Sequence, residues 1–205
     1  GDTDSVPYDE GPRASRVTYT EGQAVMKACS QIKRAIADGV VLPHTVTVEH
    51  TAEEREDITY FGAQVAEVHV DAETGEVEVL RLTTAHDVGT IINPLAHQGQ
   101  IEGGVITGFG LGVTEEFITD DGQVLNGSMA DYKLPTIADI PILDTVLIRA
   151  KGGTGPYEAK AIGELANNAT AAAIANAVAD AVGCRIFELP ITADRVYKAI
   201  RSKKT

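Results

Sequence analysis

The sequence predicts an α+β fold in which a mixed sheet with hairpins packs against helices. Two segments, Val65 to Val70 and Val77 to Leu82, alternate apolar with polar residues, as half-buried strands do. Asp71 to Gly75 between them supplies turn residues, so the two segments are expected to form a hairpin. Residues 21–37 and the alanine-rich segment that ends at Gly183 instead repeat apolar residues every three or four positions, which is typical of helices.

The elements of the first quarter follow from the same patterns. An amphipathic helix is expected from Glu21 to Ala37, and Asp38 with Gly39 should end it. His44 to Val48 alternates and predicts a strand. The acidic run from Glu53 to Asp57 predicts a solvated loop, because like charges repel one another.

The remaining elements lie on either side of a second hairpin. Asn93 and Pro94 open a long helical pattern. Residues 116–125 predict the hairpin, with its turn at Asp120 to Gly122. Thr145 to Arg149 predicts another strand, and Thr192 is expected to cap a short last helix.

Charge and composition exclude several classes of function. The net charge of −13 and the pI near 4.7 argue against nucleic acids and acidic membranes, because phosphate binding depends on Lys and Arg. The apolar runs are short and interrupted, so no membrane span is expected. Cys29 and Cys184 lack the spacing of a zinc site or a redox pair, which predicts reduced, buried thiols in a cytoplasmic protein.

No metal site built from side chains is expected. His86 and Asp87 adjoin at the end of the first hairpin, and His97 follows. Neither their spacing nor a third ligand supports zinc, so a structural role is predicted for the His86–Asp87 pair.

The predicted helix after Pro94 is unusually rich in glycine, with Gly99, Gly103, Gly104 and Gly108 in its sequence. Each glycine costs a helix about 1 kcal/mol relative to alanine. Close approach of another backbone or of a ligand should therefore compensate. Gln100 lies among these glycines and either reaches a polar ligand or is satisfied by backbone in a tight helix contact.

The stretch from Gly155 to Glu164 brings a lysine and a carboxylate to the start of a helix. The glycines and the proline from Gly152 to Pro156 predict a loop. Glu164 would lie just before the first helical turn, where the helix dipole favours an ionised carboxylate. Helix capping and proton acceptance both fit that position.

Short motifs follow one another along nearly the whole chain: Ala14 to Thr18, Gly22 to Val25, Ala85 to Gly89, Ile92 to Pro94, Gly99 to Gly104, Gly108 to Gly110, Thr114 to Glu116, Asp131 to Pro135, Ile140 to Pro141, Lys160 to Glu164 and Glu188 to Thr192. This series resembles the molybdenum hydroxylase family, which includes xanthine dehydrogenase and aldehyde oxidoreductase. The similar region is the carboxy-terminal part of the molybdopterin-binding large subunit. The resemblance implies a molybdopterin-binding domain of the xanthine dehydrogenase type.

The resemblance also implies roles for individual residues. Glu164 matches the general base that takes a proton from a molybdenum-bound hydroxyl while an electron-poor carbon of an N-heterocycle or aldehyde is hydroxylated. Gln100 matches a glutamine that bonds the pterin or the oxo group of the metal, and Lys160 a residue that adjusts the charge around the glutamate. The positions that match those holding the pterin phosphate or dinucleotide are Ala14, Ser15 and Thr18.

One departure from the family concerns the substrate wall. Family members often have prolines directly after the glutamate, whereas Leu165 to Asn168 follows here.

Residues 1–205 are expected to be a piece of a longer molybdopterin-binding subunit, with a possible subdivision near residues 40–60. The implied partners are the remainder of that subunit, a small-molecule substrate, and iron–sulfur and flavin subunits or domains that carry [2Fe–2S] and FAD. Three alternatives stay open: a carbon monoxide dehydrogenase subunit, an aromatic thioester reductase subunit, and a non-catalytic module for subunit assembly.

Overall fold

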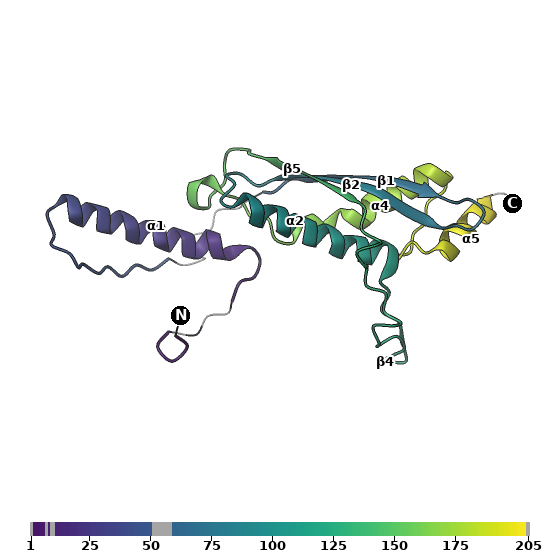
Figure 1. The fold of residues 1–205 in the computed structure, drawn as a ribbon, viewed down its shortest axis with the longest axis horizontal. Coiled ribbons are helices and arrows are strands. Elements are labelled where there is room, and N and C mark those ends of the chain that lie inside the picture. The colour runs from purple at the N-terminus through teal and green to yellow at the C-terminus, as the bar shows by residue number, and fades with distance from the viewer. Residues whose placement is uncertain (1, 7, 9–10, 51–58, 204–205) are drawn as a thin grey trace.

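A three-stranded sheet with helices along one face forms the body of the structure (Figure 1). The computed structural model describes residues 2–6, 8, 11–50 and 59–203. Strand β2 (Val77–Asp87) is central in the sheet and pairs antiparallel with β1 (Gly62–Val70) and parallel with β5 (Ile142–Ile148). The predicted hairpin, the predicted strand near residue 145 and the mixed α+β class are therefore confirmed.

The turn between β1 and β2 is built by its own polar side chains. The Oδ1 atom of Asp71 accepts hydrogen bonds from the amides of Glu73, at 2.7 Å, and Thr74, at 3.2 Å. These bonds hold the pKa of the Asp71 carboxyl below its usual range, because they stabilise the charged form. Gly75 has φ +79° and lies so close to the last helix that an added Cβ would be 2.2 Å from the Ala193 carbonyl oxygen.

Helices α2 (Pro94–Phe109) and α4 (Thr170–Val182) supply most of the apolar side chains that cover the sheet. The side chain of Asn93 caps α2 by accepting a hydrogen bond from the Ala96 amide at 3.1 Å. Between the helices and the sheet lie fully buried side chains, among them Leu82, Ile101, Val105, Ile174 and Val178. A left-handed Gly183 ends α4, as the sequence predicts.

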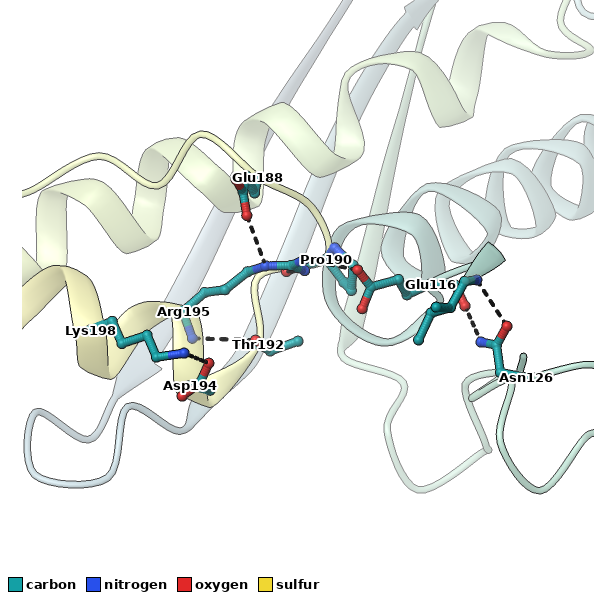
Figure 2. A network of polar contacts seen from close by, with 9 residues as sticks. Glu116, Asn126, Glu188, Pro190, Thr192, Asp194, Arg195 and Lys198 are labelled. Carbon is teal, nitrogen blue, oxygen red and sulfur yellow. Dashed lines mark hydrogen bonds and ion pairs between the residues drawn. The ribbon is translucent and has the colours of Figure 1, made fainter. Parts of the chain in front are cut away.

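The last helix, α5 (Ala193–Lys203), is joined to a projecting loop by one arginine (Figure 2). Arg195 binds Glu116 at 2.8 Å and Glu188 at 3.5 Å. Asn126 then bonds the backbone of Glu116 and Ile118, which closes the base of the short hairpin of β3 (Thr119–Asp120) and β4 (Gln123–Val124). The predicted second hairpin is present with two-residue strands, and Thr192 caps α5 by accepting from the Arg195 amide.

The glycines of α2 divide into two groups. A Cβ added at Gly104 would lie 2.8 Å from the Cβ of Ala166, and one added at Gly108 would lie 2.7 Å from the Asn167 carbonyl oxygen. These two glycines therefore let α2 contact α3 (Leu165–Asn168) closely. At Gly99 and Gly103, apart from their own helix, no described atom lies within 4 Å of an added Cβ.

Helix α1 (Arg16–Ala37) extends away from the body of the protein (Figure 1). It begins at Arg16 rather than at the predicted Glu21, and none of its 22 residues is buried. Gly22 lies against Pro156 of the single turn η3 (Pro156–Glu158), where an added Cβ would be 2.8 Å from the proline Cγ. The Gln23 side chain also donates to the Thr154 carbonyl at 3.0 Å. Contacts near the first turns thus fasten α1 to the glycine loop.

Two expectations from the sequence are wrong. Residues 44–48 form no strand, because alternation alone is insufficient when no described strand pairs with them. Cys29 is exposed and Cys184 is half-buried, so neither is the buried thiol predicted; Cys29 lies on a helix that faces no core. The predicted acidic loop at residues 53–57 lies outside the described residues.

Gly108→Ala should lower the free energy of unfolding by about 1–3 kcal/mol, because the new methyl group overlaps backbone of α3 and has no space to move. Gly103→Ala is the matched control on the same helix and should be neutral or stabilising by about 0.5–1 kcal/mol. Urea unfolding of the two variants measures the difference. Equal stabilities would contradict the assignment of Gly108 to helix packing.

Candidate functional site

A cavity of about 630 Å³ lies where three distant parts of the chain meet. Its walls come from residues 12–18 at the start of α1, from the glycine-rich side of α2, and from residues 159–164 ahead of α3. The cavity is lined by every site residue that the sequence singles out: Ala14, Ser15, Thr18, Gln100, Lys160 and Glu164. The fold therefore brings together side chains that lie as far apart in sequence as Ala14 and Glu164.

Glu164 lies immediately before α3, as the sequence predicts, and is exposed where it lines the cavity. Its side chain makes no capping hydrogen bond to the start of α3. Within the described part of the chain, no other hydrogen bond or ion pair holds this carboxylate. The carboxylate is thus available to a ligand, whereas a helix cap would be occupied.

The wall opposite α2 is shaped by an unusual backbone. Ala14 and Ser15 have positive φ angles of 50° and 55°, which turn the chain sharply into α1. The Ser15 hydroxyl accepts a hydrogen bond from the Gly163 amide at 2.7 Å. A Cβ at position 163 would lie 2.4 Å from that hydroxyl, so a larger residue there would displace the Ser15 side chain from this contact. This bond joins the start of α1 to the residue before Glu164.

Lys160 forms a buried ion pair with Asp87. Its Nζ atom lies 2.5 Å from Asp87 Oδ2, and the two side chains are only 7% and 6% exposed. The Lys160 amide also donates to the Val88 carbonyl at 3.0 Å. The loop before α3 is therefore bound to the end of β2, and the pairing with Asp87 reduces any charge effect of Lys160 on Glu164.

A second buried polar group, His86, precedes Asp87 in β2. His86 is 1% exposed, and its Nε2 atom is 2.5 Å from the Thr84 hydroxyl. Burial lowers the pKa of His86, because desolvation disfavours the charged imidazole. His86 thus has Thr84 as a partner and Asp87 has Lys160, in agreement with a structural role for the pair, although within the described residues the Nδ1 atom of His86 has no hydrogen-bond partner. Among the described residues, His, Cys, Asp and Glu side chains form no cluster of three or more that could hold a metal ion.

Sequence reasoning missed some residues of the site. Arg13 and Arg16 line the cavity on either side of Ala14 and Ser15, and their position beside that motif was the available signal. Asp87 was not connected with Lys160, because no local spacing links residues 73 positions apart.

Residues 40–141 match the sequence model of the molybdopterin cofactor-binding domain. Over 96% of its length the chain is 32% identical to the putative xanthine dehydrogenase molybdenum-binding subunit of Escherichia coli K12. The chain belongs to the molybdenum hydroxylase family. A second relative, the aldehyde oxidoreductase molybdenum-binding subunit PaoC of the same organism, is 37% identical over 66% of this chain and 19% of its own length.

Solved structures of this family have the same fold. The Cu,Mo-containing carbon monoxide dehydrogenase matches 98% of the chain with a TM-score of 0.82 and 25% identity. The aldehyde oxidoreductase from Desulfovibrio gigas matches 97% with a TM-score of 0.73 and 29% identity. The predicted molybdopterin-binding fold is thereby confirmed. The chain spans 32% of the length of the first E. coli relative and 31% and 24% of the two solved chains.

Within the described ranges, no helix is both long enough and apolar enough to cross a membrane.

Lys160→Met should lower the free energy of unfolding by about 3–5 kcal/mol, because it leaves Asp87 buried without its partner. Adding Asp87→Asn should restore much of that loss, since the unpaired charge is then removed. Denaturant unfolding of the two single variants and the double variant forms the required cycle. Additive losses in the double variant would contradict a direct ion pair.

Proposed function

We propose that the chain is the carboxy-terminal part of a molybdopterin-binding oxidoreductase subunit, and that Glu164 is the general base of a water-derived hydroxylation. The proposed substrate carries an electron-poor carbon, as in an N-heterocycle or an aldehyde. One observation carries the proposal: the Glu164 carboxylate is exposed, unpaired within the described residues, and opens on the same cavity as Gln100.

The α2 wall of the cavity fits a cofactor with a flat ring system. Gly99 and Gly103 present no side chain, so a ligand can approach the helix backbone there. Gln100 between them offers both amide donors and an amide acceptor. The volume of about 630 Å³ lies within the range of about 300–1,000 Å³ that is usual for small-molecule sites.

The wall formed by residues 12–18 fits an anionic group. The left-handed backbone at Ala14 and Ser15 leads into the first turn of α1, where backbone amides lack helical partners. Ser15 and Thr18 add hydroxyl groups to the same wall. These residues would hold the phosphate of the pterin cofactor or its dinucleotide form, with Gln100 on the ring and Lys160 fixing the loop.

When bound, the molybdenum–pterin cofactor supplies the oxygen atom, derived from water, and takes up the electron pair that leaves the substrate carbon. Glu164 accepts the proton released in that step. Its exposure lets the carboxylate pass the proton on to water, so that it can accept again in the next turnover.

The proposal requires partners, because the electron pair must leave the cofactor. We assign that task to [2Fe–2S] and FAD centres on partner subunits or domains, and the other wall of the active site to the remainder of the large subunit. We place the complex in the cytoplasm.

A second candidate, carbon monoxide oxidation, is favoured by the TM-score of 0.82 to the Cu,Mo-containing carbon monoxide dehydrogenase. Equal molar amounts of copper and molybdenum in the purified complex would favour carbon monoxide oxidation over hydroxylation.

Glu164→Gln tests the base directly, because glutamine keeps the size of the side chain but cannot accept the proton. In the full complex, turnover per molybdenum should fall by about 10²–10⁴-fold. The melting temperature should stay within about two degrees, since the side chain is exposed and caps nothing. Steady-state kinetics with molybdenum and sulfido loading measured on the same samples gives the result.

Glu158→Gln is the matched control for this test. Glu158 is an exposed carboxylate of the same loop that does not line the cavity, so its substitution should leave turnover unchanged. Near-normal turnover in Glu164→Gln would contradict the proposed role of Glu164 as the general base.

Gln100→Ala should lower molybdenum content or turnover in the complex while leaving the fold intact, because Gln100 is an exposed side chain on the cavity wall. Gln98→Ala is its control on the same helix: Gln98 bonds Glu102 and Thr145 and does not line the cavity. Molybdenum content and turnover, measured for both variants, test this expectation. Full molybdenum content and full turnover in Gln100→Ala would show that Gln100 does not bind the cofactor.

A further inference from the structure

A polar contact joins the sheet to α3, the short helix that begins directly after Glu164. Gln64 on β1 lies opposite Thr84 on β2 in the strand register. The Gln64 Nε2 atom is 2.6 Å from the Ala166 carbonyl oxygen and 3.1 Å from the Thr84 hydroxyl. One amide group therefore binds both the sheet and the helix.

The direction of the hydrogen bond between Gln64 and Ala166 is fixed by chemistry. The Ala166 carbonyl can only accept, so the amino group of Gln64, and not its oxygen, must face it. The same amino group donates to Thr84. The hydroxyl of Thr84 also contacts Nε2 of His86 at 2.5 Å. The side chains of Gln64, Thr84 and His86 thus form a polar series that leads from the Ala166 carbonyl of α3 to the buried side of β2.

Because α3 is short and begins directly after Glu164, this contact influences the position of the Glu164 carboxylate. Helix α3 has four residues, and Ala169 separates it from α4. On one side Ala166 is pressed against Gly104 of α2, where an added Cβ would lie 2.8 Å away. On the sheet side, the bond to Gln64 holds the carbonyl of the same residue. Because Ala166 is only two positions beyond Glu164, a shift of this residue moves the carboxylate in the cavity.

We infer that Gln64 is a positioning residue, which holds α3 so that the Glu164 carboxylate meets its proton donor. This role rests on the proposed function of Glu164 as the general base. Gln64 itself does not line the cavity and contacts no reacting group. Its substitution should lower kcat and leave KM and cofactor content unchanged.

The experiment uses Gln64→Met in the full complex, since methionine keeps the length of the side chain without its donors. Turnover per molybdenum should fall by about 10- to 100-fold, the scale expected for a misplaced catalytic group. Hydrogen exchange of the peptide that covers residues 165–170 should become faster, which reports the loss of the contact without reference to activity. Gln64→Asn keeps the amide but is one methylene shorter, and it tests the same bonds if Gln64→Met does not accumulate.

Two further variants separate positioning from stability. Val79→Ala opens a cavity in the same sheet away from α3, so it should lower the melting temperature and keep kcat per molybdenum. In a Glu164→Gln background, Gln64→Met should lower the residual turnover no further, because a residue that acts through Glu164 has nothing left to position.

Each unfavourable outcome has its own meaning. Normal turnover in Glu164→Gln overturns the proposed function, whatever Gln64 does. A large loss in Glu164→Gln with unchanged kcat in Gln64→Met overturns the positioning role alone. The positioning role is also wrong if Gln64→Met and Glu164→Gln have additive effects, or if the Gln64→Met loss disappears when turnover is divided by molybdenum content.

Discussion

The ion pair between Lys160 and Asp87 is the contact on which the cavity depends. Two charges almost removed from water can coexist only when they are close together, because either one alone would carry a desolvation cost of several kcal/mol. The pair therefore fixes the loop before α3 at the end of the central strand. From that loop Gly163 reaches Ser15, and Pro156 supports Gly22 on α1. The position of two cavity walls thus follows from one buried contact at the edge of the core.

Helix α2 serves the core and the cavity with different glycines. Gly104 and Gly108 remove side chains where α3 must come close, and Gly99 and Gly103 remove them where the cavity is open. Both groups weaken the helix in the same way, but only the first is compensated by contacts inside the described chain. The cost of the second group is uncompensated within those residues, which is the state expected of a surface that a ligand completes.

Much of this arrangement was predictable, and the remainder depends on contacts that local patterns do not contain. The hairpin of β1 and β2 has strong alternation and turn residues, and α2, α4 and α5 have clear start or stop signals, so these elements were correctly predicted. The site residues were found through the order of motifs along the chain. Gln64 was not singled out and Asp87 was not connected with Lys160, because their partners are distant in sequence. The predicted strand at residues 44–48 failed because pairing, not alternation, makes a strand.

Helix α1 has a further consequence for how the protein opens. It is about 33 Å long at 1.5 Å per residue and buries no side chain, and its contacts with the glycine loop lie near its beginning, at Gly22 and Gln23. Such a helix adds little to the cooperative unit formed by the sheet with α2 and α4, so it can unfold locally while that unit stays intact. The two facing walls of the cavity then belong to units of unequal stability. A ligand that contacts both walls would couple the two units. The first measurable effect of its binding would be slower local unfolding of α1.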